Sequence, residues 1–289
     1  MIWILVDPRS VRDPLILIGA MALHLTWFDS NSWLLELGGR RILLDPWLTG
    51  PLMFGNAEWF FKGEHPAPIA PPQNLDAILL SQGLEDHAHR PTLELFERSV
   101  PVIGSPSAAA VARELGFETV VALAHGDRHC LGNAVEIVAT AGAPVGPGAL
   151  ENGYVVRAIA PQDGDSAGPS VYYEPHGYHP ATLGELGPID VTLSPLLDLC
   201  IGFLPILRGG KTALQLAQMV KPQVMLPTAA AGEVRYRGLL VKALRQGGTI
   251  EGFGRSLAAT GLDCRVLQPT VGQRLAIPLT PRATPAIAG

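Results

Sequence analysis

One short segment gathers most of the side chains that could do chemistry. An apolar strand predicted over 76–80 runs directly into Ser81-Gln82-Gly83-Leu84-Glu85-Asp86-His87-Ala88-His89. Sites commonly form where strands of a sheet end, so a carboxylate and two imidazoles at this place indicate a functional site. Carboxylate oxygens and imidazole nitrogens are ligands for divalent metals, and an imidazole can also transfer protons.

A second segment offers the same residue types farther along the chain. A predicted strand ends at Tyr172-Tyr173, and Glu174-Pro175-His176-Gly177 follows it. Side chains two residues apart in extended backbone point the same way, so Glu174 and His176 could project to one side. An ordinary hydrogen-bonded pair is the alternative interpretation.

The elements that must position these segments alternate strands with helices. Asp45-Pro46 ends the strand 41–44, and Ser105-Pro106 opens a helix as N-cap and first-turn proline. Two strand-rich halves, each followed by helices, predict two sheets packed between helical layers. The other predicted strands are 24–28, 32–37, 77–80, 101–103, 120–123, 135–140, 154–159, 171–173, 191–194, 223–226 and 265–267, and the other predicted helices are 92–98, 211–220, 233–245 and 249–260.

The domain organisation follows from where this pattern begins and ends. We expect residues 1–22 to be an N-terminal appendage, 23–272 to be one domain, and 273–289 to be a loose C-terminal tail. The apolar stretch 15–25 is shorter than the ~20 residues that span a bilayer, and no basic region precedes it as in a signal peptide. The Pro- and Gly-rich segment 48–74 is either a rim over a pocket or a packed loop.

Three shorter segments have open interpretations. The run 196–207 is strongly apolar for a connection, and could be an exposed patch for a partner, a dimer interface or a membrane surface. We instead expect a buried helix or loop wall beside the pocket. Glu151-Asn152-Gly153 is interpreted as a turn, and Asp29-Ser30-Asn31-Ser32 as an Asx turn between strands.

Composition excludes several classes of function. Of the 289 residues 47% are hydrophobic and 16% are charged, with a formal net charge of −5, so tight binding of nucleic acid is disfavoured. Cys130, Cys200 and Cys264 form no Cys-x-x-Cys pair, which argues against a disulfide framework and against a cysteine zinc site. A soluble protein of a reducing, cytoplasmic compartment is expected.

The segment 81–89 resembles the signature of the metallo-β-lactamase superfamily, in which a strand ends in Ser-His-x-His-x-Asp-His and the side chains bind two zinc ions. Asp45 resembles an earlier aspartate of that family, and the resemblance extends from Leu23 to Pro269. It implies an α/β (α+β) fold, the αββα four-layer sandwich. The motifs 81–89, 151–154, 172–176 and 268–270 also resemble a branch of cyanobacterial and plant members whose histidine motif is similarly depleted.

Where the chain departs from the signature, the first metal site loses its histidines. Gln82 and Leu84 stand at the first two histidine positions, and the later ligand loops 139–144 and 227–229 contain none. Leucine cannot bind a metal, and a neutral amide is a poor zinc ligand. A standard dinuclear zinc centre is therefore not expected, and the active site is interpreted as degenerate.

The second metal site keeps more of its ligands. The resemblance puts Asp86 and His87 at two of its positions, and the Glu174–His176 segment replaces the loop of the family's bridging aspartate. It implies Asp86, His87 and His176 as ligands of one divalent metal (zinc, manganese or iron), with Glu174 as ligand or base and His89 as proton shuttle or orienter. A metal-free protein, in which these residues cap helices and fasten loops, is the alternative.

Two classes of function follow from these interpretations. The first is a hydrolase-like enzyme that uses one metal to hydrolyse a phosphoester or a lactone, as the superfamily resemblance implies. The second is a metal-free, non-catalytic binding or scaffold protein, and a metal-independent enzyme with a histidine base is a third. The expected partners are a small-molecule substrate and, as an open possibility, a second copy of the chain, with no nucleic acid and no transmembrane segment.

Overall fold

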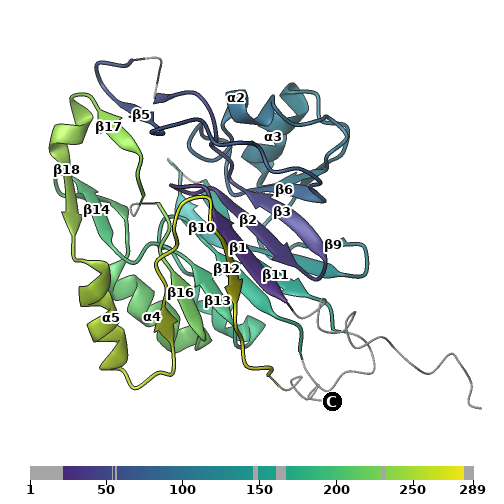
Figure 1. Ribbon diagram of the computed structural model, residues 1–289, viewed down its shortest axis with the longest axis vertical. Helices are drawn as coiled ribbons and strands as arrows, with labels where there is room; N and C mark the ends of the chain where they lie inside the picture. The colour runs from purple at the N-terminus through teal and green to yellow at the C-terminus, as the bar shows by residue number, and fades with distance from the viewer. Residues whose placement is uncertain are drawn as a thin grey trace, which may run out of the picture.

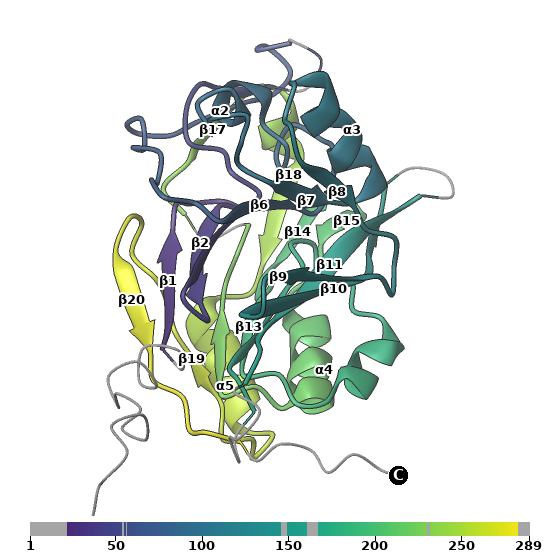
Figure 2. The ribbon, with the colours of Figure 1, turned by 90° about the vertical axis from the view of Figure 1, so that its right-hand side faces the viewer.

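The computed structural model describes residues 22–53, 55, 57–145, 149–160, 167–229 and 232–282. Over these ranges two seven-stranded sheets stack face to face, and helices cover both outer faces (Figure 1, Figure 2). The predicted αββα sandwich is confirmed. Apart from Ala22, the predicted N-terminal appendage lies outside the described residues. No helix among the described residues is long and apolar enough to cross a membrane.

The first sheet comes mainly from the N-terminal part of the chain. It begins as antiparallel pairs and continues as parallel ones beyond β3. In spatial order its strands are β20 (Arg274–Ile277), β1 (Leu23–Trp27), β2 (Trp33–Leu37), β3 (Arg40–Leu44), β6 (Ala77–Leu80), β7 (Val102–Gly104) and β8 (Val120–Ala122).

The second sheet provides the other half of the sandwich. Its centre is parallel, and the long antiparallel pair of β10 and β11 extends it on one side. In spatial order its strands are β19 (Arg265–Val266), β16 (Val224–Leu226), β13 (Val191–Leu193), β12 (Ser170–Tyr173), β11 (Leu150–Ala158), β10 (Val135–Pro144) and β9 (Arg128–Leu131).

Alternating side chains divide the interior into three apolar layers. In β3, Ile42 and Leu44 pack between the two sheets, whereas Leu43 faces the helical side of its sheet. Because successive strand residues point to opposite faces, the continuous apolar runs in these strands are buried on both sides. The central layer therefore fixes the two sheets against each other, with their strand ends at one common edge.

Helices cover the outer faces as the sequence predicts. The short α2 (Arg90–Leu93) and α3 (Pro106–Glu114) cover the first sheet, and α4 (Gly210–Val220) and α5 (Ile250–Ala258) cover the second. Figure 2 shows α3 beside β7 and β8 at one side of the sandwich and α4 beyond β13 at the other. Ser105 accepts a hydrogen bond from the backbone N–H of Ala108 at 3.3 Å, which confirms the predicted N-cap.

Two small sheets lie outside the sandwich, at the left of Figure 1. One consists of β15 (Leu204–Leu207), β14 (Asp198–Ile201) and β18 (Leu244–Gly247), and the other of β17 (Arg235–Arg237), β5 (Lys62–Glu64) and β4 (Leu52–Met53). The 3-10 helices are η1 (Ala181–Leu186) and η2 (Leu240–Ala243).

Several predicted elements are wrong. The helix expected over 233–245 is instead β17, η2 and the start of β18. The segment 196–207, expected as a buried helix or loop wall beside the pocket, contains the hairpin of β14 and β15, which lines a cavity but exposes Phe203 and Leu204 at its tip. The segment interpreted as a Glu151–Gly153 turn lies inside β11, and the helix expected over 92–98 is the shorter α2.

The segment expected as a loose tail after Gly272 is ordered over its first part. β20 pairs with β1 in antiparallel register, from Leu23 opposite Ile277 to Thr26 opposite Arg274. Leu275 packs against the central apolar layer, and Ile277 belongs to it. The predicted boundary at residue 272 is therefore too early, because an edge strand of the first sheet follows it.

Candidate metal centre

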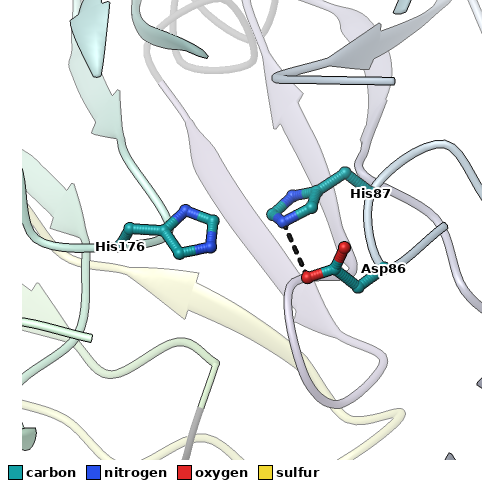
Figure 3. Close-up of side chains that lie close together, drawn as sticks. All are labelled: Asp86, His87 and His176. Atoms are coloured by element: carbon teal, nitrogen blue, oxygen red, sulfur yellow. Dashed lines mark ion pairs between the residues drawn. The ribbon is translucent and has the colours of Figure 1, made fainter. Parts of the chain in front are cut away.

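Asp86, His87 and His176 converge in one place although they come from different sheets. Each offers an atom that could bind a metal, and these atoms all lie within 4.8 Å of one another. Asp86 and His87 follow β6, and His176 follows β12 of the facing sheet. Figure 3 shows the three side chains around a common space, with the rings of His87 and His176 5.1 Å apart. Parallel stacking of the two sheets brings these strand ends together.

Asp45 contacts the imidazole of His87 on its Nδ1 side. Its Nδ1 lies 2.6 Å from Asp45 Oδ2, and the ring and the carboxylate are both fully buried. Asp45 also accepts hydrogen bonds from the backbone N–H of Ser81 at 2.7 Å, from the Ser81 hydroxyl, and from Tyr173 Oη at 2.7 Å. The contact to Nδ1 turns the other ring nitrogen, Nε2, toward Asp86, whose Oδ2 is 3.1 Å away.

His176 is held by a carboxylate in the same way. Its Nδ1 lies 3.2 Å from Oε2 of Glu151, at the start of β11, and both side chains are largely buried. The site thus contains two imidazoles, each with a carboxylate on one side. Metal-binding histidines usually have such a partner, because it fixes the ring and its tautomer and raises its basicity.

Charges within the site shift the pKa values of its members. Burial would lower the pKa of His87, but the carboxylates of Asp86 and Asp45 raise it well above its usual range. Burial would also lower the pKa of His176, but the carboxylate of Glu151 raises it above its usual value. Burial would raise the pKa of Asp86, yet His87 and His176 lower it to about 2. The three groups are therefore electrostatically coupled.

Several buried polar atoms of the site lack a hydrogen-bond partner. Asp86 Oδ1 has no hydrogen-bond partner, whereas His87 Nε2 and His176 Nδ1 have only their ion-pair contacts with Asp86 and Glu151. Buried polar atoms without hydrogen bonds are costly, and a bound ion is one physical explanation for them. Two imidazoles and one carboxylate form the mixed nitrogen and oxygen set that suits zinc, manganese or iron, so the residues fit a divalent metal.

Glu174 lies beside this cluster and serves the loop that carries His176. Its Oε2 accepts hydrogen bonds from the backbone N–H groups of His176 at 3.2 Å and of Tyr178 at 2.8 Å, and also from Gly177. Burial raises the pKa of Glu174 to about 7, although His176 and the loop N–H groups act against this shift. Its other oxygen, Oε1, is buried without a hydrogen bond. Glu174 is not among the three residues whose ligand atoms cluster.

His89 points to a different part of the molecule. Its Nδ1 lies 2.9 Å from Thr92 Oγ1, its ring lies beside Trp47, and the residue is the N-cap of α2. Burial lowers the pKa of His89 to about 4. These contacts match the capping and stacking alternative, and the structure does not bring His89 to the three clustered residues.

Residues at the other positions of the signature have varied surroundings. Gln82 is buried, Leu84 is 48% exposed, and Ala143 is buried. Thr228 accepts a hydrogen bond from the Trp33 indole at 3.1 Å and donates one to the Ser30 carbonyl at 3.0 Å. These contacts join strand ends of the two sheets to each other.

Reasoning from the sequence missed Glu151. It interpreted residues 151–153 as a turn, whereas Glu151 pairs with His176 and Asn152 donates to the Leu123 carbonyl at 2.9 Å. No local signal marks this contact, because Glu151 lies three positions before the strand predicted over 154–159. Asp29, Ser30 and Asn31, interpreted as an Asx turn, line a cavity that also reaches Asp86 and His176.

Comparisons with known proteins agree with this fold. The beta-lactamase superfamily domain matches residues 24–229. A UPF0173 metal-dependent hydrolase from Pyrobaculum arsenaticum is 24% identical over 213 residues, which are 71% of this chain and 83% of that protein. A cytidine monophosphate-N-acetylneuraminic acid hydroxylase from Danio rerio is 29% identical over 97 residues, 34% of this chain but only 16% of the hydroxylase.

Solved structures show the same architecture. Igni18, a metallo hydrolase from the archaeon Ignicoccus hospitalis, superposes with a TM-score of 0.62 at 17% identity, covering 90% of this chain and 100% of its own. At this level of identity the likeness concerns the fold. Since the domain match covers most of the chain, this hydrolase-like protein belongs to the beta-lactamase superfamily and has the metallo-β-lactamase fold.

Proposed function

We propose that the protein is a hydrolase that uses one divalent metal at Asp86, His87 and His176 to cleave a phosphoester or a lactone. The observation that carries this proposal is the pair of carboxylate-backed imidazoles facing one carboxylate. The UPF0173 relative, described as a metal-dependent hydrolase, supports the same class of reaction. A single metal is proposed because Gln82 and Leu84 stand where the superfamily signature has histidines.

The chain's own residues would prepare this site. Asp45 and Glu151 each hold the Nδ1 side of a ring, and Glu174 fixes the loop that carries His176 through its backbone N–H groups. A metal held here would supply Lewis-acid activation of water and of the substrate oxygen. Glu174, with a pKa near 7 and one free buried oxygen, is our candidate for the base.

The competing function is a metal-free binding or scaffold protein. The buried Oδ1 of Asp86, which has no hydrogen-bond partner, weighs against it, because leaving such an atom without a partner lowers the stability of the fold. A metal-independent enzyme would need a histidine base at the site. His89 is held by Thr92 away from the cluster, which leaves His87 for that role.

Metal content is the decisive measurement. Protein purified without a histidine tag should hold about one metal per chain by mass spectrometry, and the double variant Asp86→Ala/His176→Ala should hold none. The matched control is Glu94→Ala/His129→Ala, which removes one carboxylate and one imidazole from outside the site. The loaded protein should then hydrolyse an aryl phosphodiester or an alkyl lactone. Equal metal content in all three proteins, or none in any, would refute the proposal.

A further inference from the structure

A cavity of about 570 Å³ opens beside Asp86 and His176, and nothing in the metal site requires its apolar character. Cavities of this size are typical of small-molecule sites. Its polar groups lie on a few residues, including Asp29, Asn31 and Gln246, whereas most of the lining is aliphatic or aromatic. No lysine or arginine is among its lining residues in the part of the chain that the structure describes. Apart from Gln246, the walls formed by the two small sheets are therefore mainly apolar.

The first wall is one face of the sheet formed by β15, β14 and β18. In this sheet Ile201 stands opposite Leu204 on one side and Leu244 on the other, and directly opposed residues of antiparallel strands share a face. Leu199 likewise stands between Leu207 and Gln246. Five of these six residues line the cavity, and the sixth, Leu204, is 73% exposed at the tip of the hairpin.

The second wall comes from the sheet formed by β17, β5 and β4. Gly63 lies between Tyr236 and Leu52, both of which line the cavity. A Cβ atom at Gly63 would stand 3.0 Å from the Tyr236 ring and 3.0 Å from the Trp47 ring. Glycine at this position therefore lets the Tyr236 ring lie over the strand, because no side chain stands between the ring and the backbone.

The charges of the lining residues limit which substrates this cavity could bind. Asp29 directs its oxygens to the backbone N–H groups of Ser30 at 2.6 Å and of Glu233 at 2.6 Å, so it is engaged within the protein. Because the described lining residues include no lysine or arginine, a strongly anionic substrate group would have no partner away from His176 and the metal end. An alkyl chain needs no such partner and gains from each methylene that it buries.

We infer that the cavity binds a linear alkyl or acyl chain of the substrate, with its ester or lactone group at Asp86 and His176. This inference rests on the proposed hydrolase function and narrows it to carboxylic esters with an apolar chain. Burial of a methylene contributes enough to strengthen binding roughly threefold to fourfold, so affinity should rise steeply with chain length.

The test separates chain binding from hydrolysis. Butanoate, octanoate and dodecanoate, below their micelle concentrations, compete with the dye 1-anilinonaphthalene-8-sulfonate for the chelator-treated full-length protein. We expect dodecanoate to displace the dye at concentrations at least a hundredfold lower than butanoate. Ile201→Gln and Leu244→Gln should lose most of this dependence, and Leu199→Trp, which fills the cavity, should weaken dodecanoate more than butanoate. Leu95→Gln, at an exposed leucine elsewhere, is the matched control.

The outcomes distinguish the two proposals. Equal displacement by all three carboxylates, or unchanged length dependence in the Ile201→Gln, Leu244→Gln and Leu199→Trp proteins, would overturn the alkyl-chain assignment. Length-dependent displacement without hydrolysis of p-nitrophenyl octanoate or of γ-dodecalactone by metal-loaded protein would support the cavity assignment and count against the hydrolase. Hydrolysis of p-nitrophenyl acetate and octanoate at equal efficiency would support the hydrolase and overturn the cavity assignment.

Discussion

The two halves of the candidate metal centre have the same arrangement, a histidine beside a carboxylate, in different surroundings. His87 and its partner Asp45 are fully buried, and Asp45 also accepts hydrogen bonds from Ser81 and Tyr173. His176 has Glu151 as its partner and lies at the wall of the cavity. Asp45 thus joins strand ends of both sheets, whereas Glu151 joins a strand to one loop. The first half belongs to the core of the fold, and the second belongs to the ligand site.

Because of this difference, we expect the two halves to contribute unequally to folding stability and to metal binding. Removing the carboxylate from the His87 half leaves an imidazole, a hydroxyl and a phenol buried without this partner. Removing the carboxylate from the His176 half affects one ring that already borders the cavity. Substitutions in the two halves should therefore give different ratios of lost stability to lost metal affinity.

The largest effect is expected for Asp45→Ala. Breaking a buried charged pair by removing one partner costs about 3–5 kcal/mol, and the hydroxyls of Ser81 and Tyr173 each lose one of their two hydrogen-bond partners. Urea denaturation of metal-free protein measures this loss of unfolding free energy. Asp76→Ala, which breaks a partly exposed pair with Arg40, is the control and should cost far less. Equal losses in the two variants would contradict the central role of Asp45.

A smaller and more selective effect is expected for Glu151→Gln. The variant keeps the size of the side chain but removes the charge beside His176 Nδ1. Loss of such a supporting partner typically weakens metal binding about 10–100-fold. Zinc titration against a competing chelator measures the affinity, and urea denaturation of the metal-free variant should change little. Glu136→Gln, at a carboxylate that pairs with Arg128, is the control. Unchanged zinc affinity would mean that Glu151 does not support a ligand.

The sequence was sufficient to predict which residues at the strand ends lie together, but not which carboxylate pairs with His176. Asp86, His87 and His176 could be placed together because local patterning and the family resemblance both indicate where strands end. Glu151 could not, because it meets His176 only through the pairing of β11 with β12, and no local pattern marks that contact. The carboxylate partner of His176 is therefore set by strand pairing in the folded protein and not by a local sequence pattern.

The wrong helix over 233–245 has a related cause. Leu240 and Leu244 are four residues apart, a spacing that is typical of one face of a helix. In the structure both side chains line the cavity, one from η2 and one from β18. Strand pairing of β18 with β14 and of β17 with β5 overrides the local preference. The apolar residues serve a ligand cavity, which periodicity alone does not reveal.

The smallest effect is expected from pH, in the loop that carries His176. His179 lies near Tyr172 Oη at 3.2 Å and near the Ser194 hydroxyl at 3.5 Å, and burial lowers its pKa to about 4. An unfolded histidine has a pKa of about 6.5, so the unfolded chain binds this proton first as the pH falls. The contribution of a neutral His179 to stability is complete above about pH 6.5 and declines toward pH 4.

For this partly buried ring we expect a loss of ~1 kcal/mol across that window. Urea midpoints of metal-free protein, measured at several pH values for the wild type and for His179→Asn, give the comparison. The variant should lose less stability between these pH values, because no imidazole is left to titrate at this position. Parallel pH profiles for the two proteins would show that His179 is not buried in its neutral form. A difference confined to this window would show that the neutral His179 ring contributes to the stability of the folded protein.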